Sequence, residues 1–150
     1  MQPFDTAVVS PAGAGREAFA FGRHTLRITA AQTGGSLGVF EAEVPPGEGP
    51  PLHVHEKEDE FFRVLSGRFA FWCNGTRVEL GADGLIVVPR GAVHRFQNIG
   101  TTTGHLMTLM TPGGFEGFFP AVEAARPESP EAIAALAARY NLRFVQEEVA

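Results

Sequence analysis

Residues 50–62 read Pro-Pro-Leu-His-Val-His-Glu-Lys-Glu-Asp-Glu-Phe-Phe, and this stretch contains two histidines and four acidic residues. Side chains two apart on a strand share one face, so His53 and His55 can bind one ion together. Glu60 follows an acidic turn and opens the next apolar run, where it can complete three ligands on one side of an ion. Imidazole and carboxylate are donors that suit a divalent transition metal. The stretch therefore predicts most of a metal site.

A fourth ligand comes from further along the chain. Residues 89–91, Pro-Arg-Gly, form a rigid turn that would begin a strand carrying His94 and bring it alongside the others. Three histidines and one carboxylate leave one or two positions of an octahedral ion open for water or substrate. Iron, manganese, nickel, cobalt and zinc all suit this donor set, so the identity of the metal stays open. We interpret the neighbouring acids Glu56, Glu58 and Asp59 as a solvated acidic loop.

Short apolar runs separated by turn residues predict an all-β fold. The chain has 18 Gly and 11 Pro, placed as punctuation between those runs. Asn74-Gly75 is the strongest hairpin signal, because both residues tolerate positive φ. Strands at such regular spacing imply a sandwich or barrel. The predicted strands are residues 24–31, 37–44, 60–65, 68–74, 85–88, 94–98 and 105–111.

The C-terminal tail, residues 118–141, has a helical pattern instead. Ser129 can cap a helix whose first residue is Pro130, and apolar residues then recur at helical spacing as far as Tyr140. Asn141 is the expected end of this helix, and a shorter helix is expected over about residues 118–125. These helices would pack on the outside of the barrel or close its mouth. We expect one domain over residues 1–150.

Composition excludes several classes of protein. A net charge of −5, with Arg and Lys scattered along the chain, argues against a nucleic-acid partner. No apolar run approaches the roughly 20 residues that span a bilayer, and the first residues lack the features of a signal peptide. Cys73 is the only cysteine, so no intramolecular disulfide can form, and we interpret it as a buried, inert thiol. We therefore expect a cytoplasmic protein with neither a membrane nor a nucleic-acid partner.

The spacing of these residues resembles the two sequence motifs of the cupin superfamily. Residues 47–67 reproduce the first motif without a gap, and residues 89–98 reproduce most of the second. The resemblance covers about residues 37–111. It implies a double-stranded β-helix, the cupin jelly-roll barrel, with one divalent metal at one end, and it implies a homodimer. The ligands that it implies are His53, His55, Glu60 and His94.

Three further stretches are similar to quercetin 2,3-dioxygenase-like proteins. They are residues 50–62, residues 111–116 (Thr-Pro-Gly-Gly-Phe-Glu) and residues 138–142 (Ala-Arg-Tyr-Asn-Leu). This similarity implies oxygen-dependent ring cleavage of a flavonol bound to the metal. It also implies that Glu60 is both a ligand and the general base that takes the proton of the substrate hydroxyl.

Aromatic residues are expected around the metal. The chain has 13 Phe and one Tyr, which suggests a cavity walled by aromatic carbon and suited to a planar or apolar ligand. The alternative, that these side chains simply fill the barrel, stays open. We interpret His24 and His105 as ordinary strand histidines outside the site. The predicted pocket residues are Phe62, Phe69, Phe71 and Phe96.

Three functional interpretations follow. The first is a metal-dependent dioxygenase-like enzyme that uses dioxygen and an aromatic, flavonol-like or enolisable small molecule. The second is a metal-dependent isomerase or lyase that needs no oxygen, with Glu60 as the base. The third is a non-catalytic protein that binds a small molecule, so the sequence leaves open whether the chain is an enzyme.

Overall fold

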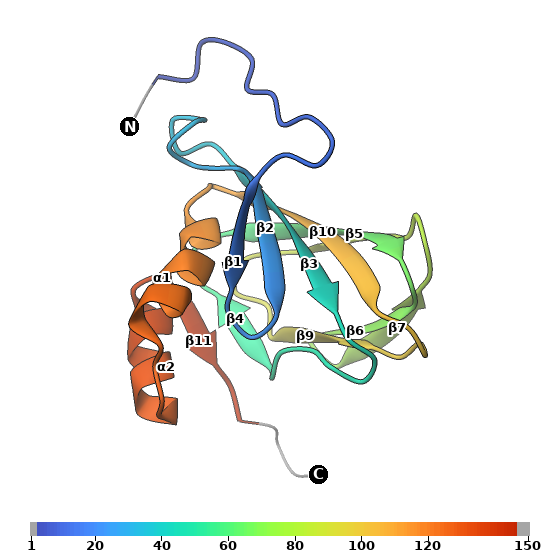
Figure 1. The fold of residues 1–150 in the computed structure, drawn as a ribbon. Coiled ribbons are helices and arrows are strands. Elements are labelled where there is room, and N and C mark those ends of the chain that lie inside the picture. Colours follow the sequence, from blue (N-terminus) through green and yellow to red (C-terminus); the bar gives the residue numbers. More distant parts are fainter. Residues whose placement is uncertain (1–2, 147–150) are drawn as a thin grey trace.

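Two antiparallel sheets face one another in the computed structural model, which describes residues 3–146 (Figure 1). The first sheet has six strands in the order β1-β2-β3-β10-β5-β8, and the second has five in the order β11-β4-β9-β6-β7. This is the double-stranded β-helix that the sequence predicted. The strands of the first sheet are β1 (Arg16–Phe19), β2 (Arg23–Ile28), β3 (Gly38–Val44), β5 (Asp59–Ser66), β8 (Leu85–Val88) and β10 (Gly104–Thr111). Those of the second are β4 (His53–His55), β6 (Phe69–Cys73), β7 (Thr76–Leu80), β9 (His94–Asn98) and β11 (Leu142–Phe144).

Each predicted strand has a counterpart, and the differences lie in short or exposed segments. The strand expected over residues 24–31 ends at Ile28 because the chain turns there. β1 and β11 were not predicted, because their four and three residues are too few to show a clear alternation. β7 is exposed along most of its length and so lacks an apolar face. The Asn74-Gly75 hairpin is confirmed, since Cys73 pairs with Thr76 and both turn residues have positive φ.

Alternation along the central strands builds the barrel core. β3 and β10 bury every second residue, and they pair along their whole length from Gly104 opposite Val44 to Met110 opposite Gly38. Phe62, Val64 and Leu106 pack between the sheets with Phe69 and Phe71 of the opposite sheet. The inner face of the first sheet therefore meets the inner face of the second, as in a sandwich closed on itself.

Both helices lie on one side of the barrel, next to β1 and β11 (Figure 1). A short 3₁₀ turn, η1 (Phe115–Gly117), leads into α1 (Phe118–Ala125), as predicted. α2 (Pro130–Ala138) begins at the expected cap, where the amide of Ala132 donates to Ser129 Oγ at 3.0 Å. It ends before Asn141, which adopts a left-handed conformation (φ 59°) and starts the turn into β11. The helices bury an apolar cluster against the first sheet.

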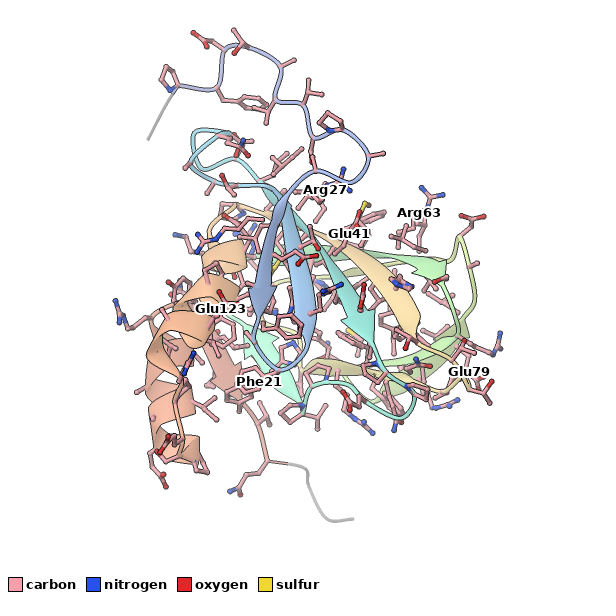
Figure 2. All side chains as sticks on the ribbon, in the orientation of Figure 1. Phe21, Arg27, Glu41, Arg63, Glu79 and Glu123 are labelled. Atoms are coloured by element: carbon pink, nitrogen blue, oxygen red, sulfur yellow. The ribbon has the colours of Figure 1, made fainter. Side chains whose placement is uncertain are left out.

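Charged side chains cover the outer face of the strands (Figure 2). Arg27 of β2 pairs with Glu41 of β3 at 2.8 Å, and Arg63 of β5 pairs with Asp83 at the same distance. Arg63 thus points away from the barrel interior, in keeping with its parity relative to Glu60. None of the helices within residues 3–146 has the length and apolar character needed to span a bilayer.

Asn98 ties the end of β9 to distant backbone, and its loss should cost stability. It is 1% exposed, and its Nδ2 donates to the carbonyls of Val44 (2.8 Å) and Thr102 (2.9 Å). Its Oδ1 accepts from the amide of Gly100 at 2.8 Å. We expect Asn98→Ala to lower the free energy of unfolding by about 3 kcal/mol, because buried backbone groups lose their partners. Urea denaturation followed by circular dichroism measures this.

The neighbouring Gln97→Ala is the matched control. Gln97 makes one hydrogen bond, at 3.0 Å to the carbonyl of Gly47, in an exposed setting. Its loss should cost less than about 1 kcal/mol. Equal effects of the two substitutions would contradict this assignment.

Candidate metal centre

Four donor side chains from three strands converge inside the barrel. His53 and His55 come from β4, Glu60 from β5 and His94 from β9, and one ligand atom from each lies within 4.8 Å of all the others. All four residues are at most 6% exposed. His53 stands directly opposite His94 in the β4–β9 pair, and this register joins the two sequence motifs. The structure therefore brings together every predicted ligand.

Backbone carbonyls orient two of the imidazoles. Nδ1 of His53 donates to the carbonyl of Pro51 and Nδ1 of His94 donates to the carbonyl of Ala92, each at 2.9 Å. A carbonyl can only accept, so each ring carries a proton on Nδ1. This leaves a lone pair on Nε2 of the neutral His53 ring, whereas Nε2 of His94 lies 2.9 Å from Oε1 of Glu60 and shares a proton with that carboxylate when no ion is bound. A metal-ligating histidine commonly has its other ring nitrogen held in this way. Both rings are thus prepared to coordinate through Nε2.

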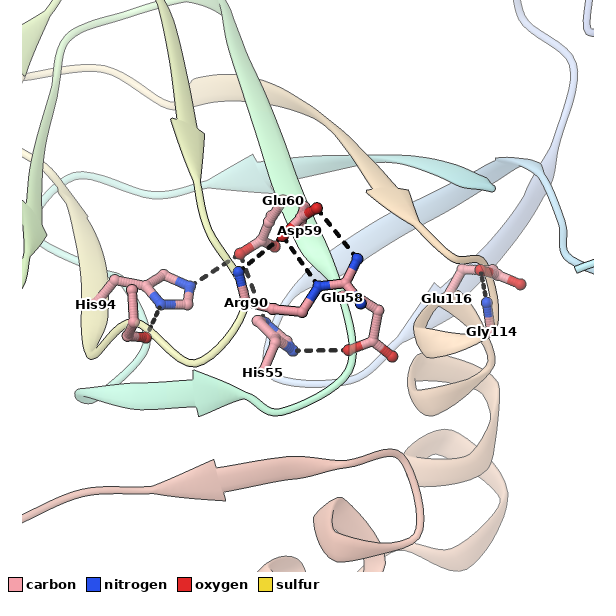
Figure 3. A network of polar contacts seen from close by, with 9 residues as sticks. His55, Glu58, Asp59, Glu60, Arg90, His94, Gly114 and Glu116 are labelled. Carbon is pink, nitrogen blue, oxygen red and sulfur yellow. Dashed lines mark hydrogen bonds and ion pairs between the residues drawn. The ribbon is translucent and has the colours of Figure 1, made fainter. Parts of the chain in front are cut away.

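Glu60 is the centre of the local electrostatics (Figure 3). Its Oε1 lies 2.9 Å from Nε2 of His94 and 3.6 Å from Nε2 of His55. Burial alone would raise the pKa of Glu60, but the surrounding imidazoles outweigh it and hold the pKa below the usual value. The same carboxylate overcomes the effect of burial on His94 and raises its pKa. Glu60 is therefore ionised at neutral pH.

Burial keeps the other two imidazoles neutral. Desolvation, followed by the nearby rings of His94 and His55, lowers the pKa of His53 to about 3. Desolvation is also the main reason why the pKa of His55 is lowered. Neutral imidazole is the form that binds metal. The four donors fit one divalent ion, which would displace the proton that Nε2 of His94 shares with Glu60.

Glu58 corrects the prediction of a solvated acidic loop. It is 3% exposed, and its Oε2 lies 4.0 Å from Nδ1 of His55 (Figure 3). Neither atom has a hydrogen-bond partner within residues 3–146. Burial raises the pKa of Glu58 to about 7. Glu58 thus lies behind His55, where the other two ligand histidines have a backbone carbonyl.

The other acids of this turn do face outward, and one of them fixes the geometry of the site. Asp59 accepts from the backbone amide of Arg90 at 2.9 Å and from its guanidinium at 3.2 Å. The amide of Gly91 donates to the carbonyl of His55 at 2.9 Å. These bonds hold the turn at residues 89–91 against the β4–β5 segment. His94 is thereby placed by contacts with the turn that carries the other ligands.

A cavity of about 1080 Å³ opens beside three of the four donors. His53, His55 and Glu60 form part of its wall, together with Phe62 and Phe96, and His94 lies behind them. Phe69 and Phe71 do not line it. They belong to the barrel core, where the ring of Phe71 contacts those of Phe62 and Phe96, and the ring of Phe69 contacts that of Phe96, at centroid distances of 5.4–6.1 Å.

Other residues line the cavity that the sequence analysis did not place there. Phe40 of β3 shares the inward alternation of its strand, which is a signal that could have identified it. Phe115 packs edge-on to His55 with ring centroids 4.5 Å apart. Phe119 and His24 stack on each other at 3.8 Å. No lysine or arginine of the described chain lines this cavity.

The sequence of the barrel matches a known family. Residues 40–110, which contain all four donors, match the Cupin domain family. The match covers just under half of the chain, and the double-stranded β-helix described above is the fold of that family. The structure of KdgF from Halomonas sp. has the same fold, with a TM-score of 0.66 at 15% identity over 75% of this chain and 99% of that one.

Proteins of several named kinds are similar in sequence to this chain. Over 85 residues the chain is 31% identical to the polyketide synthase CurC of Streptomyces cyaneus, covering 57% of this chain and 54% of CurC. Over 49 residues it is 41% identical to the oxidoreductase iacF of Pestalotiopsis fici, covering 32% of this chain and 24% of iacF. The matches thus span about half of CurC and a quarter of iacF. The similarity is therefore to a part of each protein, and the activity of the whole protein does not follow from it.

Removal of any donor should abolish tight metal binding. We expect His53→Ala, His55→Ala or His94→Ala to lose the single divalent ion on dialysis against a weak chelator, whereas the unaltered protein retains one ion per chain. Inductively coupled plasma mass spectrometry after loading with zinc measures the stoichiometry. His105→Ala is the control, because His105 lies on the barrel surface and pairs with Ser66. Full retention by the His94 variant would contradict the site.

Glu58 should tune metal affinity without contacting the ion. We expect Glu58→Leu to weaken zinc affinity by about tenfold, because the imidazole of His55 loses the carboxylate behind it. Competition with a fluorescent zinc chelator measures the change. Glu56→Leu is matched in chemistry and lies in the same turn, but Glu56 pairs with Arg143 on the surface, so affinity should be unchanged.

Proposed function

We propose that this cupin is a metal-dependent oxygenase that acts on an aromatic, flavonol-like or enolisable small molecule. One observation carries the proposal: an ionised carboxylate, Glu60, lies among three imidazoles on the wall of a large aromatic cavity. The oxidoreductase iacF among the relatives supports the same class of chemistry.

The residues of the cavity have distinct roles in this proposal. His53, His55 and His94 would hold the ion together with Glu60, and a redox-active ion would supply the oxygen chemistry. Glu60, deprotonated at neutral pH, accepts the proton of a substrate hydroxyl or acidic C–H placed beside it. Phe62, Phe96 and Phe115 exclude water and orient a planar ring by their apolar faces.

The side chains that line the cavity favour neutral aromatic substrates over charged ones. Its wall is dominated by phenylalanine and aliphatic carbon, and it contains no cationic side chain within residues 3–146. A small dicarboxylate would lose hydration there without gaining a charged partner. A bicyclic or tricyclic phenol would bury apolar surface and present a hydroxyl to Glu60.

The relation to CurC supports a second candidate, which uses the same residues without oxygen. Polyketide synthesis passes through carbonyl compounds with acidic C–H groups, and Glu60 can remove such a proton; an ion held by the four donors would supply a Lewis acid beside it. Turnover with zinc as the only metal, in the absence of oxygen, would favour this isomerase or lyase activity.

Oxygen uptake tests the leading proposal. The protein is loaded anaerobically with iron(II), manganese, cobalt or nickel, and oxygen consumption is recorded with flavonols and β-diketones. We expect uptake with at least one metal, and a loss of at least about a hundredfold in kcat for Glu60→Gln, because the base is removed while an oxygen donor remains.

Metal content of the Glu60→Gln protein is measured in parallel, so that loss of the base is separated from loss of the ion. Glu48→Gln is the matched control, since Glu48 lies at the exposed rim of the same cavity. No uptake with any of the four metals and both substrate types would refute the oxygenase.

A further inference from the structure

His24 contributes a polar atom to the aromatic part of the cavity, away from the metal ligands. It lies on β2, and its ring stacks on Phe119 with an interplanar angle of 14°. Successive neighbours β5, β10, β3 and β2 separate Glu60 from His24. Three strand spacings of about 4.8 Å separate the two strands by roughly 14 Å across the sheet, and His24 is level with Val64, so Glu60 is also displaced by four residues, roughly 13 Å, along β5. Both side chains line the same cavity, so they mark two ends of it.

The hydrogen bonding of His24 determines which ring nitrogen is available. Nδ1 lies 3.3 Å from the carbonyl of Gly22, which can only accept, so the proton is on Nδ1. Nε2 then carries a lone pair, and it has no protein partner within residues 3–146. Desolvation lowers the pKa of His24 to about 4, so the ring is neutral near pH 7 and Nε2 remains an acceptor.

Packing alone does not explain this residue. A phenylalanine would stack on Phe119 equally well and would leave no unpaired nitrogen in an apolar wall. Nε2 of His24 is not among the fully buried unpartnered atoms within residues 3–146, so it is open to the cavity, where water or a ligand can complete its hydrogen bond. Between His24 and the metal ligands the wall is largely aromatic, with the ring centroid of Phe40 at 6.2 Å from that of His24, and it includes Thr108 of β10. The cavity therefore has a polar group at each end and mostly apolar surface between them.

We propose that Nε2 of His24 accepts a hydrogen bond from a hydroxyl at the end of an aromatic ligand remote from the metal centre. This inference rests on the proposed function, which supplies the class of ligand. It narrows that class to elongated phenols of two or three linked rings. One hydroxyl of such a ligand meets Glu60 and a second, at the opposite end, meets His24. His24 is a specificity-determining residue in this arrangement and takes no part in the chemical step.

Two ligands that differ by one hydroxyl test the proposal. 3-Hydroxyflavone and 3,4′-dihydroxyflavone are titrated calorimetrically into zinc-loaded protein, in which no oxygen chemistry competes. We expect the second ligand to bind about tenfold more tightly, the effect of one hydrogen bond in an apolar site. His24→Phe keeps the ring stack and should remove this preference, whereas His24→Gln keeps an acceptor and should retain part of it.

His105→Phe is the control for a histidine-to-phenylalanine change outside the cavity, and it should preserve the preference. Equal binding of the two flavones by the unaltered protein, a persisting preference in His24→Phe, or no binding of either flavone would each overturn the inference. The readout is independent of turnover. A preference that depends on His24 in a protein that consumes no oxygen with any metal would refute the oxygenase while leaving this ligand contact in place.

Discussion

The pairing of β4 with β9 is the constraint on which the rest of the site depends. It sets His53 opposite His94, and the hydrogen bond from Gly91 to the carbonyl of His55 extends the same contact into the preceding turn. Because side chains alternate along a strand, this register also decides that His55 points inward. A slip of one residue would turn the imidazoles of β4 away from Glu60. The backbone pairing of β4 with β9 thus places the ligand side chains without any contribution from a metal ion.

This arrangement concentrates polar groups in an otherwise apolar interior. The Glu60–His94 contact at 2.9 Å provides partial compensation, since each partner stabilises the charged form of the other. His53 and His55 remain neutral, and Nε2 of His55 lies 3.6 Å from Oε1 of Glu60. Such a cluster is poorly satisfied by protein groups alone, and a cation among the four donors would satisfy it. Binding free energy for the ion would then add to the stability of the fold.

Much of this could be predicted from sequence because the decisive signals are local. Strand alternation, the Asn74-Gly75 turn and the spacing of the four donors each depend on a few adjacent residues. What was missed depends on tertiary contacts. Whether Glu58 is solvated or buried depends on how the acidic turn packs against the barrel. Phe69 and Phe71 share the inward parity of cavity residues, yet Phe62 and Phe96 separate them from the cavity. The homodimer stays a prediction, because the structure of one chain contains no contact between two protomers.

The acidic turn shows how side-chain direction divides one charge run into separate roles. Four carboxylates occur within residues 56–60, and their exposure alternates with the path of the backbone. Glu56 pairs outward with Arg143 next to β11, and Asp59 pairs outward with Arg90 beside the turn that leads to His94. Glu58 and Glu60 point inward, one behind His55 and the other among the donors. The outward pair attaches the turn to two neighbouring segments. The interpretation of these acids as a solvated loop holds for Glu56 and Asp59 and is wrong for Glu58, whose side chain falls on the same inward side as the ligand Glu60.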